Sequence, residues 1–267
     1  MVELAFLSGG TVDGSWPLAI LLGAAFLAGF IDSIVGGGGL IQIPVLFSLF
    51  PGVAPALLLG TNKVASVFGT SAAAIQYVRR VEVAWNTVLP ATAAALVFAF
   101  LGAWTVTQIP PDFLRNALPF ILAAVALYTF KKKDFGSRHA PRHEGRGERV
   151  RGAAVGGAIG FYDGFFGPGT GSFLIFVFVR FFGFDFVRAS AAAKVVNVAC
   201  NLAAIAWFAS AGQVAFGVAL LMAVFNVSGA LVGSRLAMAR GTGFVRHLFL
   251  IVVVSLIVKT GYDAFIH

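Results

Sequence analysis

The sequence predicts an all-α polytopic membrane protein made of two inverted-topology repeats. Of its 267 residues, 59% are hydrophobic and only 11% are charged, and its mean hydropathy is +0.91. Too few polar residues are present to cover the surface of a soluble globule of this size. The second half of the chain repeats the first at an offset of 131 residues, and a basic segment separates the halves. Each repeat is therefore expected to contain a broken or re-entrant helix pair and three spanning helices.

Charged residues carry the evidence for the repeat, because matching alanines and valines are common in any membrane protein. The repeat divides the chain into a first transmembrane repeat over 1–130, a basic cytoplasmic linker over 131–150 and a second transmembrane repeat over 151–267. The charged residues that match at the offset of 131 are Asp32 and Asp163, Lys63 and Lys194, and Arg115 and Arg246.

Apolar runs bounded by glycine, proline and charge divide each repeat into five segments. The second segment of each repeat has about 11 residues, which reach ~16 Å as a helix against ~30 Å of hydrocarbon. It must begin or end inside the membrane, so the first two segments form either a re-entrant hairpin or two tilted crossings. Both arrangements leave an odd number of crossings per repeat, so the repeats are inverted. The segments are 16–35, 40–50, 56–79, 84–108 and 112–130 in the first repeat, and 151–166, 172–182, 187–210, 214–238 and 246–264 in the second.

The linker indicates how the chain is oriented. Lys131 to Arg151 holds eight basic and three acidic residues, and short loops rich in Lys and Arg stay in the cytoplasm. This orientation places both termini outside the cytoplasm. The same segment accounts for most of the net charge of +8 without a nucleic-acid partner.

A glycine-rich break joins the first and second segments of each repeat. The first break reads AGFIDSIVGGGGLIQIPVL from Ala28 to Leu46, and the second reads GFYDGFFGPGTGSF from Gly160 to Phe173. Irregular backbone persists at membrane depth only where protein buries it or where it lines a wet cavity, and the free N–H groups of a helix N-terminus bind anions. Inversion would bring two such N-termini to one cavity, although the glycines could instead serve close helix packing alone. The predicted binding groups are Gly36, Gly37, Gly38, Gly39 and Leu40 in the first repeat, and Gly167, Gly169, Thr170, Gly171 and Ser172 in the second.

A polar stripe runs along the third segment of each repeat. Lys63 and Lys194 lie about eight residues into that segment, so ~12 Å deep and near the membrane centre. A lysine there requires a partner, which is either an anionic substrate or, in structural ion pairs, the carboxylates of Asp32 and Asp163. An aspartate that exchanges its proton in this environment is also a candidate for coupling transport to protons. The stripe residues expected to bind the substrate are Asn62, Lys63, Ser66, Lys194, Asn197 and Asn201.

These motifs resemble the sulfite exporter TauE/SafE family over almost the whole chain. The resemblance rests on GFIDSIVGGGGLIQIPVL followed by GTNKVASVFGTSAAAIQYV, and on GFYDGFFGPGTGSF with AKVVNVACN in the second repeat. It implies a multi-pass permease of the bacterial plasma (inner) membrane for small sulfur-containing anions such as sulfite or sulfoacetate. The exact anion, the direction of transport, the coupling ion and the oligomeric state are left open. Pro168 and Thr170 replace first-repeat glycines, so the two breaks need not contribute equally.

Two other functions stay open on the residues alone. Re-entrant half-helices also occur in anion channels, although neither repeat has the Asn-Pro-Ala turn of one such class. Asp32 and Asp163 would form the dyad of an intramembrane aspartyl hydrolase if their carboxyl groups were close enough to share a proton. We expect a transporter and not an enzyme, with the lipid bilayer and a small anion as partners and with no cofactor, metal or nucleic acid.

Overall fold

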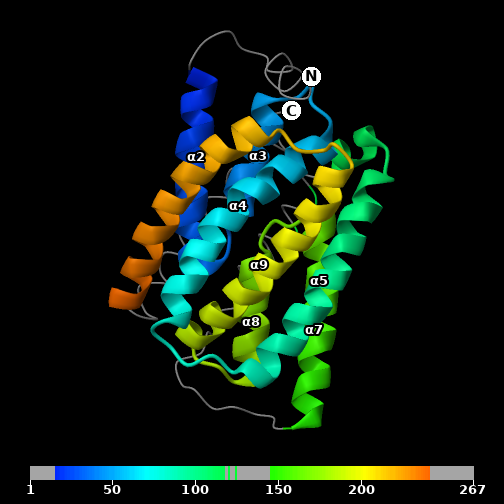
Figure 1. Ribbon diagram of the computed structural model, residues 1–267. Coiled ribbons are helices and arrows are strands. Elements are labelled where there is room, and N and C mark those ends of the chain that lie inside the picture. The colour runs from blue at the N-terminus through cyan, green and yellow to red at the C-terminus, as the bar shows by residue number, and fades with distance from the viewer. Residues whose placement is uncertain (1–15, 118–119, 121–123, 125–144, 241–267) are drawn as a thin grey trace.

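The fold is known from a computed structural model that describes residues 16–117, 120, 124 and 145–240. This part of the chain is helical and contains no strand, which confirms the all-α prediction. The helices pack into one elongated bundle (Figure 1). They are α2 (Trp16–Val35), α3 (Gly39–Leu49), α4 (Pro55–Val78), α5 (Trp85–Thr107), α7 (Arg146–Phe165), α8 (Thr170–Phe182) and α9 (Phe186–Ser210), with further helices at 111–117 and at Phe216–Arg240.

Helix lengths separate the elements that can cross a membrane from those that cannot. Four described helices are long and apolar enough to cross: α2, α5, α9 and Phe216–Arg240. Helices α3 and α8 have 11 and 13 residues, about half of the ~20 residues that a crossing requires. This finding confirms the two short helices predicted at 40–50 and 172–182. Segments 112–130 and 246–264 lie largely or wholly outside the described residues.

Helix α7 begins earlier than the sequence predicts. It starts at Arg146 instead of at residue 151, so the last residues of the predicted linker 131–150 are helical. Glu148 lies in the first turn, where a carboxylate favours the positive end of the helix dipole, and it accepts a hydrogen bond from Thr87 of α5. These two interactions extend the helix into the basic segment, most of which lies outside the described residues.

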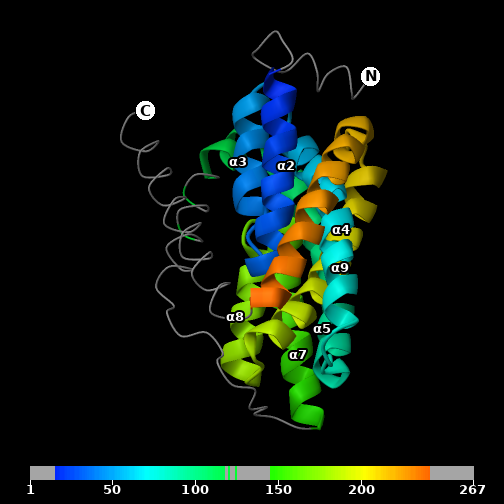
Figure 2. The ribbon, with the colours of Figure 1, turned by 90° about the vertical axis from the view of Figure 1, so that its left-hand side faces the viewer.

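Helices from opposite halves of the chain pack against one another through glycines. Helix α5 lies along α7, and a Cβ at Gly102 of α5 would lie 2.2 Å from the carbonyl oxygen of Phe161. In the second half, a Cβ at Gly233 would lie 2.4 Å from the carbonyl oxygen of Phe30, which places Phe216–Arg240 against α2 (Figure 2). Both interfaces depend on direct backbone contact, which glycine alone permits.

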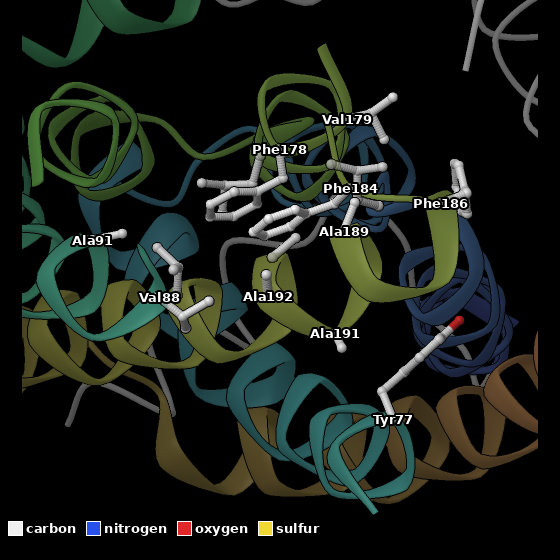
Figure 3. Packing of buried hydrophobic residues seen from close by; sticks show 14 of the residues in the cluster. Tyr77, Val88, Ala91, Phe178, Val179, Phe184, Phe186, Ala189, Ala191 and Ala192 are labelled. Carbon is white, nitrogen blue, oxygen red and sulfur yellow. The ribbon is translucent and has the colours of Figure 1, made fainter. Parts of the chain in front are cut away.

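An aromatic cluster holds α8 in place. The rings of Phe178 and Phe184 stack with centroids 5.8 Å apart (Figure 3), and Phe182 packs on both. Val88 of α5 and Ala192 of α9 belong to the same buried cluster. Helix α8 is too short to cross the bundle, so this packing determines where its N-terminus lies.

The two glycine breaks meet inside the bundle. The Ser172 amide donates to the Gly36 carbonyl at 3.1 Å, and the Ser172 hydroxyl donates to the Val35 carbonyl at 2.8 Å. Gly36 has φ +81°, and a Cβ there would lie 2.3 Å from the carbonyl carbon of Gly171. The start of α8 therefore packs directly on the end of α2, with backbone against backbone.

Helix α9, which carries Lys194, is fixed at its N-terminus by Asp185. The Asp185 carboxylate accepts hydrogen bonds from the amides of Val187 and Arg188, both at 3.0 Å, and from the Arg188 guanidinium at 2.6 Å. Burial alone would raise the pKa of this carboxyl group, but the hydrogen bonds and the positive charge of Arg188 outweigh burial and lower the pKa. The charged form of Asp185 is therefore the one that caps the helix.

Substitution of Gly36 by alanine is expected to disrupt the fold, whereas substitution of Gly37 is not. The Gly36→Ala Cβ would enter the backbone of Gly171 and require an unfavourable φ, at a cost of about 3 kcal/mol or more. The nearest atom to a Cβ at Gly37 is 3.7 Å away. Thermal unfolding of the purified protein in detergent checks this difference, and equal melting temperatures for the two variants would contradict the backbone contact.

Removal of the α9 cap is expected to lower stability in a pH-dependent way. Asp185→Ala should reduce the free energy of unfolding by about 1 kcal/mol at neutral pH. Because folding lowers the pKa of Asp185, its contribution is complete above the pKa of the unfolded chain and is lost as the pH falls through the folded pKa. Melting temperatures of the wild type and the variant should therefore converge in acid, and a constant difference would argue against the charged cap.

Candidate functional site

A small polar cavity lies where the two glycine breaks meet. The centre of a water molecule can occupy a volume of about 30 Å³ inside it. This space holds about one or two water molecules. Four predicted site residues do not line it: Gly37, Leu40, Ser172 and Lys194. The predicted residues that the structure brings together at its wall are Asp32, Gly36, Gly38, Gly39, Asn62, Lys63, Ser66, Asp163, Gly167, Gly169, Thr170, Gly171, Asn197 and Asn201.

Two buried ion pairs flank the cavity, and each joins the two halves of the chain. The Lys63 ammonium lies 2.5 Å from the Asp163 carboxylate, and the Lys194 ammonium lies 2.9 Å from the Asp32 carboxylate. Each lysine thus pairs with the aspartate of the other repeat. Lys194 also donates to the Asp32 carbonyl, so its charge caps the C-terminal end of α2, where a cation is favoured.

The ion pairs differ in their contact with water. The side chains of Lys63 and Asp163 are 4% and 2% exposed, and that of Lys194 is 1% exposed, whereas that of Asp32 is 18% exposed. The Asp32 carboxylate is therefore the charged group of the site that comes nearest to solvent.

The predicted polar stripes support the carboxylates. Thr70 of α4 donates to Asp32 at 3.3 Å, and Asn197 of α9 donates to Asp163 at 3.5 Å. Asn201, one turn further along α9, donates to Asn197 at 3.3 Å. The α4 and α9 stripes thus hold the aspartates in place, and their hydroxyl and amide groups form part of the cavity wall.

Backbone amides without a hydrogen-bond partner in the described part of the chain lie beside the cavity at the starts of α3 and α8. Gly38, Gly39, Gly169 and Gly171 line the cavity, and their amides make no hydrogen bond within the described part of the chain. The Leu40 amide, by contrast, donates to the Gly37 carbonyl at 3.0 Å. The Ser172 donors are likewise occupied by the end of α2, so the backbone amides available to a ligand are those of the glycines.

Asn226, on helix Phe216–Arg240, is a cavity residue that the sequence analysis missed. Its side-chain amide donates to the Ala25 carbonyl at 3.2 Å and to Gln42 at 3.0 Å. The residue 131 positions before it is Ala95. Because this position is not polar, the comparison of the two halves did not single out Asn226. A single asparagine inside an apolar span was the available signal, because such residues usually face a bundle interior.

Two buried polar atoms near the cavity have no hydrogen-bond partner. They are Oδ1 of Asn62, whose side chain lines the cavity, and Nε2 of Gln42, which holds Asn226. Unpaired buried polar atoms are uncommon and destabilising, so the site has unused capacity to bind a polar ligand. Among the described residues, no group of three or more His, Cys, Asp or Glu side chains could hold a metal ion.

Breaking one ion pair is expected to cost more stability than removing both of its members. Lys63→Met leaves the Asp163 carboxylate buried without a counter-charge and should cost about 3–5 kcal/mol, whereas Lys63→Met combined with Asp163→Asn should recover most of the loss. The exposed Arg188→Ala is the control and should cost at most about 1 kcal/mol. Melting curves in detergent measure all three, and a Lys63→Met variant no less stable than Arg188→Ala would contradict a buried pair.

Comparison with known proteins identifies a family and several similar proteins. Residues 21–260 match the family described as Sulfite exporter TauE/SafE. The chain is 42% identical over 242 residues to the probable membrane transporter protein ORF9 of Sinorhizobium sp, with 91% of each chain covered. It is 36% identical over 251 residues to the probable membrane transporter protein YfcA of Escherichia coli K12, covering 92% of this chain and 90% of the relative.

A third relative has a similar description. It is a probable membrane transporter protein of Haemophilus influenzae, 35% identical over 250 residues, covering 92% of this chain and 95% of the relative. No solved structure matches the chain. The family match and the relatives together show that this chain belongs to the TauE/SafE sulfite exporter family of membrane transporters.

Proposed function

We propose that the protein is a secondary transporter that carries small sulfur-containing oxyanions, sulfite or organosulfonates such as sulfoacetate, across the bacterial plasma membrane by alternating access. One observation carries the proposal: two interrupted helices meet and surround one interior cavity with free amides and paired lysines. The fold in that case consists of two inverted-topology repeats, and the end of the bundle where α7 begins faces the cytoplasm (Figure 1).

The chemistry of the cavity wall supports an anionic substrate. Amides of Gly38, Gly39 and Gly169 lie at the positive ends of α3 and α8 with no other acceptor, which is the arrangement that binds oxyanions at helix N-termini. Lys63 and Lys194 can offset the substrate's charge by exchanging a carboxylate for it. Asn62, Ser66, Asn197 and Asn201 then orient the substrate.

Reciprocal contacts support the inverted repeat. Lys63 pairs with Asp163 as Lys194 pairs with Asp32, and each of these four residues has its equivalent 131 positions away. Helix α2 begins at the upper end of the bundle in Figure 1, and α7, its equivalent, begins at the lower end. Inverted repeats with a site at their interface are a common design of secondary transporters.

The size of the cavity favours a carrier over a channel. Its volume of about 30 Å³ suits water better than an oxyanion, so binding and release require the walls to move. Asp32 is partly exposed and Asp163 is not, which suggests that one side of the site approaches water while the other is closed. Movement of one repeat against the other would reverse that relation.

Protons are the proposed coupling ion. Protonation of Asp32 or Asp163 would cancel the carboxylate charge and release the paired lysine for the substrate. An aspartyl hydrolase is less well supported, because each carboxylate is bonded to a lysine whereas a dyad requires the carboxylates to share a proton with each other.

Uptake into proteoliposomes tests the proposal. Purified protein should take up labelled sulfite or a sulfonate with saturable kinetics, and unlabelled substrate on the opposite side should accelerate it. Lys63→Ala and Lys194→Ala should each reduce uptake per folded protein by about ten-fold or more, because each leaves a buried carboxylate unpaired at the site. Arg188→Ala, at a partly exposed pair whose residues do not line the cavity, should behave as the wild type.

The same preparation separates the alternatives. Large conductance that does not saturate would indicate a channel, and absence of uptake for sulfite, sulfate and sulfonates would refute the substrate class. Asp32→Asn and Asp163→Asn should abolish acceleration by an imposed pH gradient. If acceleration persists in both variants, protons are not coupled through these aspartates.

A further inference from the structure

The charges around the cavity cancel one another. Of the described residues, the charged side chains at its wall are Asp32, Lys63 and Asp163, and Lys194 completes the set through its ion pair with Asp32. Each lysine already has a carboxylate partner. While both aspartates are charged, as in these two ion pairs, an incoming anion therefore meets a site whose side chains have no net charge.

The helix N-termini supply the remaining positive potential. Helices α3 and α8 both begin at the cavity, and each N-terminus is equivalent to about half a positive charge. The opposing C-terminal end of α2 is already capped by Lys194 and Ser172. The two N-termini together offset about one negative charge, so a dianion would keep an uncompensated charge in a poorly solvated interior.

Two amide side chains add hydrogen-bond acceptors to the wall. Asn62 Oδ1 has no donor. The Asn226 amide nitrogen faces the Ala25 carbonyl, so its oxygen must point the other way, toward Gly69, where a Cβ would lie 1.9 Å from it. A fully deprotonated oxyanion has acceptors only and cannot satisfy such oxygens, whereas a hydroxyl group can.

These acceptors are not duplicated on the other side of the cavity. At the offset of 131 residues, Gly69 and Asn226 correspond to Cys200 and Ala95. Gln42, which holds Asn226, corresponds to Phe173. Asn226 and Gln42 therefore have apolar counterparts, and the second half contributes Asn197 and Asn201 to the wall at other positions. The two sides of the cavity thus carry different polar groups, and a substrate with a single hydroxyl group would bind in one orientation.

We propose that, within the proposed substrate class, the cavity selects a singly charged oxyanion that carries one hydroxyl group, as the hydroxyl form of hydrogen sulfite and hydroxyalkanesulfonates do. It would bind these anions in preference to dianions, sulfoacetate included, and to monoanions without a hydroxyl. The oxyanion end binds the amides of α3 and α8, and the hydroxyl donates to Asn226 or Asn62. This inference rests on the proposed function, since it presumes that the cavity binds an anion.

Binding to the purified wild type tests the inference without requiring transport. Dissociation constants are obtained in detergent at one pH from the ligand-induced shift in melting temperature. Methanesulfonate and sulfate have similar shapes but differ in charge, and methanesulfonate should bind at least about ten-fold more tightly. Hydroxymethanesulfonate and ethanesulfonate differ in a hydroxyl against a methyl, and the former should bind about three- to ten-fold more tightly.

Variants test whether Asn226 and Asn62 cause the preference for a ligand with a hydroxyl group. Asn226→Ala should remove the preference for hydroxymethanesulfonate over ethanesulfonate and retain that for methanesulfonate over sulfate. Asn62→Ala is the second variant, in case Asn226→Ala does not fold. Thr92→Val is the matched control, because it removes an unpartnered buried hydroxyl that does not line the cavity, and both preferences should persist in it.

The outcomes separate this inference from the proposed function. Measurements on the wild type alone can overturn the inference. They do so if sulfate binds as tightly as methanesulfonate, or if ethanesulfonate binds as tightly as hydroxymethanesulfonate. Unchanged preferences in folded Asn226→Ala and Asn62→Ala also overturn it. If the binding preferences hold but proteoliposomes take up no sulfite, the transport proposal fails and the selectivity of the cavity stands.

Discussion

The exchange of ion-pair partners between the repeats is the interaction on which the interior of this protein depends. Lys63 and Lys194 lie in helices of different halves, and within the described residues each is neutralised by the aspartate of the other half. A lone lysine or aspartate in an apolar bundle is strongly unfavourable. Neither half can therefore bury its own polar stripe without the other, and the pairs fix how the halves face each other.

Glycine makes this exchange geometrically possible. The end of α2 packs directly on the start of α8 because Gly36 and Gly171 have no side chains, and this contact brings the two halves together beside the ion pairs. The same principle operates at the outer interfaces, where Gly102 and Gly233 permit backbone contact between helices of different halves. At these positions the helices contact each other through backbone atoms, as small residues permit in membrane proteins.

The two halves are alike in plan but differ in detail at the cavity. The paired charges and the glycine breaks recur in both, whereas Asn226 and Gln42 have apolar counterparts in Ala95 and Phe173. A carrier requires similar halves so that it can open to either side, yet a site that recognises an asymmetric ligand requires unequal walls. The observed arrangement meets both requirements, because the charges are shared and the amides are not.

Length and composition determined the helical class and the short helices, since hydropathy and the 1.5 Å rise per residue are local properties. The spacing of Lys63 and Lys194 likewise revealed the buried stripe, because helical periodicity places neighbours on one face. Tertiary structure alone decided which lysine pairs with which aspartate, that the Ser172 amide is occupied, and that Asn226 reaches the cavity. These features join residues 100 or more positions apart, so they depend on how whole helices pack, and no local pattern in the chain encodes them.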